Sequence, residues 1–190
     1  MTEDHPFAAY DPEGARAALS GLIIRAAALS DTPYIALIDA QENEALAKTY
    51  EPLIHGELER IASGELARYT AVAEADGHVV GYSRCGLIEG AENLPDGWYL
   101  NGLKVKKAFR RRGIGEAMTT HRLDWLRERT QLVYYFTAEI NPVSMDLHHK
   151  FGFEELERNV VVPFDRVKFP QRLFSLRFTG SSARKDGNRV

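Results

Sequence analysis

The chain has 190 residues, a formal net charge of −3 and one cysteine, with 44% hydrophobic and 27% charged residues. This length can bury one core, the acidic balance argues against a surface devoted to nucleic acid, and a lone Cys85 excludes an internal disulfide. The start lacks a secretory signal and no window reaches the roughly 18 apolar residues of a membrane span, so we expect a cytoplasmic protein with no membrane partner.

The first part of the chain predicts one short strand and two helices. A short apolar run predicts the strand at residues 21–26. Capping residues just before Pro33, which suits a first helical turn, predict a helix to about residue 42. A second helical stretch is predicted at residues 43–67.

A hairpin is the clearest local signal in the middle of the chain. Asp76-Gly77 is a favoured two-residue turn, and it predicts antiparallel strands at residues 69–75 and 78–88. After a loop rich in glycine, proline and acidic residues, a further strand is predicted at residues 98–106.

This last strand changes parity near its middle. Side chains alternate between the two faces of a regular strand, so the even-numbered Trp98 and Leu100 would lie on one face and the odd-numbered Leu103 and Val105 on the other. One inserted residue at Asn101-Gly102 would form a β-bulge and explain the change. A strand buried on both faces would show the same pattern, so both interpretations stay open.

The remaining elements alternate in the same way. An amphipathic helix begins at the glycine run that ends at Gly115, and a β-branched and aromatic run predicts a strand at residues 131–139. Asn141 is predicted to cap a helix that Gly152 ends. The closing strands are predicted at residues 153–162 and 173–178. The pattern predicts one mixed domain at residues 21–178, after a leader at 1–20 and before a flexible tail at 179–190.

A basic, glycine-containing run joins the parity-changing strand to the amphipathic helix: Arg110-Arg111-Arg112-Gly113-Ile114-Gly115. Glycines at such a turn let backbone N–H groups approach a ligand closely. The first turn of a helix adds unpaired N–H donors and the positive end of the helix dipole. Together these features predict a phosphate site, while the charge alone would also fit a solvated basic face or a nucleic-acid patch.

Two segments carry a resemblance to a known family. Arg110-x-x-Gly113-x-Gly115, after Leu103-Lys104-Val105, resembles the acetyl-CoA-binding motif of the GNAT N-acetyltransferase superfamily. A later segment resembles that family's helix motif, Asn-x-x-small-x-x-Leu-Tyr-x-Lys-x-Gly-Phe. It reads Asn141-Pro142-Val143-Ser144-Met145-Asp146-Leu147-His148-His149-Lys150-Phe151-Gly152-Phe153.

The resemblance implies an α/β (mixed α+β) fold with one central, mostly antiparallel twisted sheet of about six or seven strands. The sheet would be splayed at its centre, where the coenzyme enters, with about four helices on both faces. Acetyl-CoA would be the cosubstrate, without a metal. The implied coenzyme-binding residues are Leu103, Lys104, Val105, Arg110, Arg111, Arg112, Gly113, Ile114, Gly115, Glu116, Asn141 and His148. A plain helix N-cap is the alternative for Asn141.

The implied function is an N-acetyltransferase that moves an acetyl (acyl) group from acetyl-CoA to a primary amine of a small molecule or peptide, by direct attack in a ternary complex. The alternative is a non-catalytic CoA-binding sensor or scaffold of the same fold. We expect no nucleic-acid partner, and a homodimer stays open.

The catalytic residues are less well defined. The family's usual acid is a tyrosine in the second motif, where this chain has His148, whose neutral ring still carries one N–H. The alternative is that His148 only lines the coenzyme channel and that water or Tyr135 protonates the thiolate. Glu139, at the end of a predicted strand, is the candidate base, and the alternatives are Glu89, Glu92 and Asp96 of the acidic loop or a chain of waters that ends at one of these carboxylates. The candidate substrate-binding residues are Glu89, Glu92 and Asn101.

Overall fold

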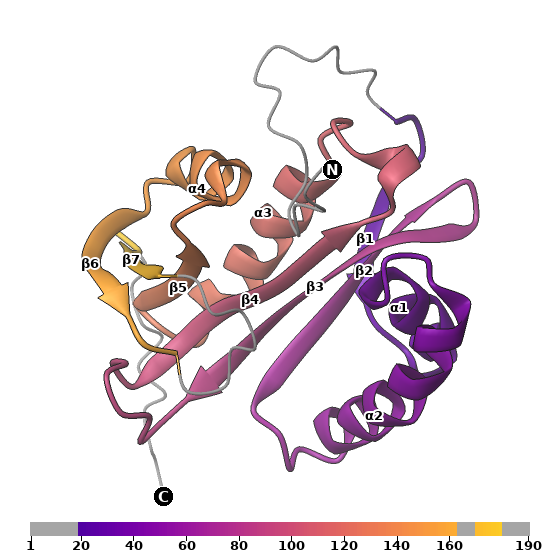
Figure 1. Cartoon of the computed structure of the whole chain (residues 1–190), viewed down its shortest axis with the longest axis horizontal. Coiled ribbons are helices and arrows are strands. Elements are labelled where there is room, and N and C mark those ends of the chain that lie inside the picture. Colours follow the sequence, from indigo (N-terminus) through magenta and orange to yellow (C-terminus); the bar gives the residue numbers. More distant parts are fainter. Residues whose placement is uncertain (1–18, 163–169, 180–190) are drawn as a thin grey trace, which may run out of the picture.

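A seven-stranded sheet organises the protein (Figure 1), and the computed structural model describes residues 19–162 and 170–179. The strand order is β1-β2-β3-β4-β5-β7-β6. All neighbouring strands run antiparallel except β4 and β5, which are parallel. The strands are β1 (Ile23–Ala26), β2 (Arg68–Ala75), β3 (His78–Ile88), β4 (Gly97–Val105), β5 (Leu132–Ala138), β6 (Glu154–Val160) and β7 (Gln171–Arg177).

The four α-helices cover both faces of the sheet (Figure 1). They are α1 (Thr32–Asp39), α2 (Glu44–Ala62), α3 (Ile114–Arg127) and α4 (Pro142–His149), with short 3-10 turns η1 (Leu29–Asp31) and η2 (Lys107–Phe109). Val79 of β3 packs in the core formed by α1 and α2, whereas its neighbour Val80 packs against Met118 of α3. Met145 of α4 packs in the same core as Leu123 of α3, so α3 and α4 share a face. The predicted fold is confirmed.

The local sequence signals predicted most helix and strand ends to within a few residues of where the structure has them. The Asn43 side chain accepts a hydrogen bond from the Leu46 amide at 3.0 Å and begins α2. The helix predicted at residues 43–67 ends at Ala62 because Gly64, with φ of 79°, turns the chain toward β2. The helix predicted to reach about residue 42 ends at Asp39, since the next residues include Gln41 at a left-handed φ of 53°.

The β-bulge predicted in β4 is present at Gly102. Leu103 pairs with Ser83 and Asn101 pairs with Arg84, which leaves Gly102 as the extra residue, at φ of 54°. The extra residue lets Leu100 and Leu103 face the same α3/α4 side of the sheet despite their opposite parity.

The sheet is splayed between its two central strands. The parallel pairing of β4 with β5 covers only Trp98 to Leu100, which lie opposite Val133 to Tyr135. Beyond Leu100, β4 continues to pair with β3 as far as Val105, but it has no pairing with β5. The splay therefore begins at the bulge.

The predicted leader and tail fall almost entirely outside the described residues, and the domain boundaries at 21 and 178 stay predictions. Within residues 19–162 and 170–179, no helix has the length and apolar character needed to cross a bilayer.

Candidate active site

The basic glycine run forms the turn that leads into α3. Gly113 has φ of 81° and directly precedes Ile114, the first residue of the helix. The Ala117 amide makes the first helical bond, to the Gly113 carbonyl at 3.0 Å, so the amides of the first turn are left for another acceptor. Gly115 lies between Leu103 of β4 and Leu147 of α4. The turn therefore places N–H groups beside the part of β4 that β5 does not pair with.

The three arginines of the run have different surroundings. The Nε of Arg110 donates to the Val105 carbonyl at 3.0 Å, and the guanidinium of exposed Arg112 lies 5.8 Å from the Phe109 ring centroid. Two nitrogens of Arg111, Nε and Nη2, are buried and have no hydrogen-bond partner among the described residues. Buried donors without a partner are costly, so Arg111 is the side chain best suited to receive an anion.

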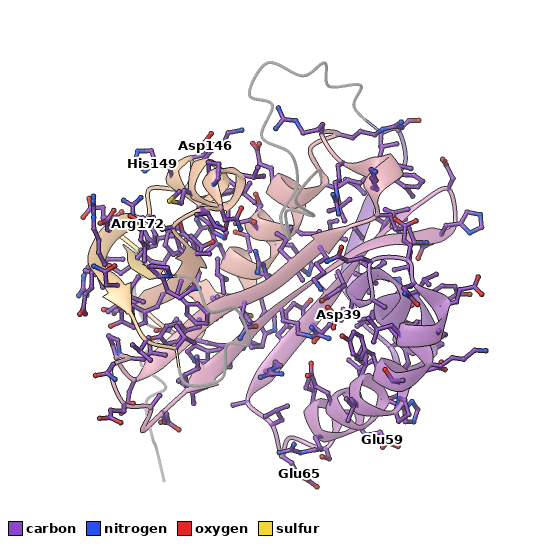
Figure 2. The ribbon with its side chains drawn as sticks, viewed as in Figure 1. Asp39, Glu59, Glu65, Asp146, His149 and Arg172 are labelled. Atoms are coloured by element: carbon purple, nitrogen blue, oxygen red, sulfur yellow. The ribbon has the colours of Figure 1, made fainter. Side chains whose placement is uncertain are left out.

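On the opposite face of the sheet, Lys104 of β4 is tied to α1. Its Nζ donates to the Asp39 carboxylate at 2.6 Å and to the Asp39 carbonyl at 2.8 Å. The Tyr82 hydroxyl also donates to that carboxylate, at 2.6 Å. Figure 2 shows Asp39 at the end of α1, facing the sheet. The Lys104 side chain is thus engaged, and only its backbone is available on the splayed edge.

These contacts control the charge of Asp39. Burial alone would raise the pKa of this carboxyl, but the hydrogen bonds from Lys104 and Tyr82 outweigh burial and hold the pKa below its usual value. Asp39 is therefore ionised at neutral pH and is a weak base. Sequence reasoning did not identify this cluster, because Asp39 and Lys104 are 65 residues apart.

His148 lies inside the protein, whereas its neighbour His149 is exposed on the outer side of α4 (Figure 2). The His148 ring stacks on Tyr135 with centroids 4.0 Å apart, and its Nδ1 lies 2.8 Å from the Ser144 carbonyl. Because a carbonyl only accepts, Nδ1 carries the proton and donates it. Nε2 is buried and has no partner among the described residues.

The protonation state of His148 follows from this environment. Burial, reinforced by the positive charge of Arg122, lowers the pKa of the ring to about 3. The ring is therefore neutral at pH 7, its one N–H is engaged with Ser144, and Nε2 is a hydrogen-bond acceptor. An acid role for His148 stays a prediction, and it would require the Nδ1 proton to leave Ser144.

Tyr135 occupies the point where the two central strands separate. It is the last residue of β5 paired with β4, and its ring lies between those of His148 and Phe174, with centroid distances of 4.0 and 4.6 Å. Its hydroxyl is buried without a partner among the described residues, and burial raises its pKa. The hydroxyl therefore keeps its proton at neutral pH and can donate it to a ligand.

The other candidate residues are spread along the chain. The Asn141 side chain accepts from the Ser144 amide at 3.2 Å and caps α4. Asn101 lies beside the bulge, and its buried Oδ1 has no partner within the described ranges. Glu139 is exposed just after β5, and Glu89 and Glu92 are exposed before β4, at the end of that strand away from the bulge. The structure thus brings Asn101, but neither loop glutamate, to the splay.

Two further groups bear on the chemistry of the site. Cys85 is buried in β3, and burial raises the pKa of its thiol to about 12, which makes it an inert core residue. In the described part of the chain, no group of three or more His, Cys, Asp or Glu side chains is arranged to hold a metal ion.

Comparison with known proteins gives a family and a set of similar folds. The model of the acetyltransferase (GNAT) family matches residues 31–153. Ribosomal-protein-alanine N-acetyltransferase from Brucella melitensis is 26% identical, with a TM-score of 0.62, and the match covers 82% of this chain and 99% of that one. None of the curated protein sequences matches the chain.

Two more distant structures share the fold. An N-acetyltransferase from Staphylococcus aureus Mu50 is 20% identical, with a TM-score of 0.65 and coverage of 83% of this chain and 99% of that one. The PaiA N-acetyltransferase from Thermoplasma acidophilum, solved in complex with coenzyme A, is 14% identical, with a TM-score of 0.60 and coverage of 84% and 100%.

Proposed function

Because the chain belongs to the GNAT family of acetyltransferases, we propose that it transfers an acetyl group from acetyl-CoA to a primary amine by direct attack in a ternary complex. The observation that carries this proposal is the splay of β4 from β5 beyond Leu100 and Tyr135. It leaves one edge of β4 unpaired beside a turn rich in N–H donors, which suits an extended ligand that ends in phosphates.

The residues present fit the coenzyme. The amides from Arg111 to Glu116 would hold the pyrophosphate, with the unpartnered nitrogens of Arg111 as additional donors. The backbone of residues 103–105 would pair with the pantetheine arm as an added strand would. Asn141 would contact the pantetheine through its amide nitrogen, because its oxygen already caps α4. PaiA N-acetyltransferase, which shares the fold, was solved with coenzyme A.

The acceptor amine must be neutral to attack the thioester. A lysine-like amine with a pKa near 10.4 loses about 4.6 kcal/mol to protonation at pH 7, whereas an α-amine with a pKa near 8 loses only about 1.4 kcal/mol. Asp39, the carboxylate held against β4, is kept a weak base by Lys104. This environment favours an amine of low pKa, such as the N-terminus of a peptide, with Glu139 or a chain of waters as the proton acceptor.

The tetrahedral oxyanion requires a donor at the point where it forms. A backbone N–H at the bulge beside Gly102 is the proposed donor, because the extra residue removes that segment from regular pairing with β3. The Tyr135 hydroxyl is the proposed proton source for the departing sulfur, since the one N–H of His148 is engaged with Ser144.

A CoA-binding sensor is the second candidate function. It is favoured by one observation, the unprotonated Nε2 of His148 at the position where the family's motif has an acidic tyrosine. A sensor needs the coenzyme site but no proton donor beside the sulfur.

Release of CoA thiol on mixing the protein with acetyl-CoA and an amine separates the two functions. We would test polyamines, aminoglycosides, lysine and peptides with a free N-terminal alanine, the last because the Brucella relative is named as a ribosomal-protein-alanine N-acetyltransferase. An enzyme releases thiol in proportion to acetylated amine. Binding of acetyl-CoA by calorimetry without release by any amine would establish a sensor, and absence of binding would refute both functions.

A further inference from the structure

A buried cation lies under the splayed region and has no role in the proposed coenzyme binding or proton transfers. Arg122 of α3 is 1% exposed, and it forms no ion pair with any carboxylate in the described ranges. Burial lowers the pKa of its guanidinium to about 10, so it stays charged at pH 7. An uncompensated buried charge is among the most costly features a core can contain, and an apolar side chain of similar volume would avoid that cost.

The hydrogen bonds of Arg122 place it at the bulge. One terminal nitrogen donates to the Arg84 carbonyl at 2.9 Å. Arg84 pairs with Asn101, the residue just before the extra Gly102, so this carbonyl lies where the pairing of β3 with β4 shifts register. The other terminal nitrogen donates to the Thr119 hydroxyl at 3.1 Å, and that hydroxyl donates to the Gly115 carbonyl at 2.8 Å. Arg122 thus connects the bulge to the glycine turn.

Arg122 and His148 lie on the same face, on either side of β4. Cys85, Leu100 and Tyr135 are aligned across β3, β4 and β5, and all three belong to the core under α3 and α4. Arg122 bonds to β3 and His148 stacks on β5. Neighbouring strands are about 4.8 Å apart, so two strand spacings separate these positions by roughly 10 Å. The sulfur of a coenzyme in the splay would lie between them.

We propose that the buried positive charge of Arg122, acting at a distance and without touching the substrate, stabilises the thiolate that leaves when the thioester is cleaved. This inference rests on the proposed function. In the step concerned, the amine nitrogen forms a bond to the carbonyl carbon, the carbon–sulfur bond breaks, and its electron pair leaves on sulfur as thiolate. The amine proton passes to the proton acceptor, and the thiolate later takes a proton from water, either directly or through Tyr135, which regains its proton from water. Cleavage therefore does not depend on an acid at His148.

The expected size of the effect follows from Coulomb's law. The sulfur would lie between two positions roughly 10 Å apart, so it would be nearer than that to Arg122; a unit charge within about 10 Å, at an effective dielectric constant near 20, lowers the pKa of a thiol by at least about one unit. The titratable groups that face Arg122 are Cys85 from β3, Tyr135 from β5 and His148 from α4. Burial raises the pKa of the Cys85 thiol to about 12 and raises the pKa of the Tyr135 hydroxyl, and it lowers the pKa of the His148 ring to about 3. None of the three groups therefore titrates between about pH 5 and 9.

This window allows a direct test on the CoA complex, without turnover. The thiolate of bound CoA is titrated by its ultraviolet absorbance in the wild-type protein, Arg122→Met and Arg122→Lys. We expect the pKa of the bound thiol to lie at least about one unit below that of free CoA in the wild type, with no shift in Arg122→Met. The shift should be smaller in Arg122→Lys than in the wild type, because burial lowers the pKa of a lysine at this position and removes part of its charge. Thr119→Val is the matched control, because it removes one bond of Arg122 but keeps the charge, and it should keep the shift.

Turnover and stability give the second measurement. Arg122→Met should lower kcat about tenfold, with KM for acetyl-CoA and the melting temperature close to the wild type, because an apolar residue of similar volume avoids burying a charge. A purely structural role would instead lower the melting temperature and leave the thiol pKa unchanged.

The outcomes are distinct. If the wild-type protein binds CoA and the thiol titrates as it does in free CoA, this inference is overturned and the proposed function stands. If Arg122→Met does not fold, Arg122→Gln decides in its place, because a shift that persists without the charge would also overturn this inference. Failure of the wild type to bind CoA overturns the proposed function and this inference together.

Discussion

The glycine turn before α3 offers a test in which backbone strain and coenzyme binding can be separated. Gly113 has φ of 81° and Gly64, after α2, has φ of 79°. A Cβ added at either position meets no atom within 4 Å, so both substitutions to alanine impose the same local strain and no clash. Only Gly113 lies beside the proposed pyrophosphate site.

The two variants should therefore match in stability and differ in binding. A left-handed conformation costs an alanine about 1–2 kcal/mol, which for a chain of this size lowers the melting temperature by roughly 2–8 °C in each variant. In Gly113→Ala the same strain also displaces the amides of the turn from the positions that face the ligand. The loss of one hydrogen bond to a charged phosphate, about 1.5–3 kcal/mol, would weaken acetyl-CoA binding by roughly 10- to 150-fold. Gly64→Ala should bind as the wild type does.

Isothermal titration with acetyl-CoA and thermal denaturation of the three proteins measure both quantities. The reasoning is refuted if Gly113→Ala loses stability as Gly64→Ala does and still binds acetyl-CoA with wild-type affinity. That result would mean that the amides of this turn do not hold the coenzyme.

Four further predictions concern the side chains of Arg111, Lys104 and His148. Arg111→Ala should weaken acetyl-CoA binding about tenfold or more because it removes buried donors that have no partner in the described part of the chain. The exposed Arg60→Ala should leave calorimetric affinity unchanged. Lys104→Met should lower the melting temperature at pH 7. Because the pKa of Asp39 is depressed in the folded state, the difference in melting temperature between the wild type and Lys104→Met should shrink as the pH falls below about 4. A difference that stays constant with pH would contradict the ion pair between Lys104 and Asp39. As the pH falls from about 6.5 to 3, the melting temperature of the wild type should fall relative to that of His148→Phe. In this range His148 binds a proton in the unfolded chain but not in the folded protein, where its pKa is about 3. If the melting temperatures of the two proteins change in parallel across this range, the ring is not held neutral. Turnover should fall more in His148→Phe than in His148→Tyr if the ring acts on the sulfur, and equal near-wild-type rates would remove that role.

Much of the fold could be predicted because its signals are local. The caps at Asn43 and Asn141 act on amides three residues away, and the Asp76-Gly77 turn joins two adjacent strands. The parity change in β4 also lies within one strand, and it correctly located the bulge at Gly102. The glycine turn depends on backbone conformation over a few residues, which the residue types themselves restrict.

The polar interior of the site could not be predicted in this way. Periodicity assigns Arg122 to a helix and Lys104 to a strand, but it does not say what lies opposite either side chain. The Asp39 carboxylate that binds Lys104 is 65 residues away, and the Arg84 carbonyl that binds Arg122 is 38 residues away.

The sequence by itself therefore determined the family, the order of the elements and the place of the glycine turn, because these depend on short-range conformational preferences. Only the tertiary structure decided the state of the charges. Burial between α4 and β5 makes His148 a neutral ring with its proton on Nδ1, and burial under the bulge leaves Arg122 a cation with no counter-ion among the residues that the structure describes. Desolvation and pairing depend on which distant segments meet, and a pKa is set by those neighbours.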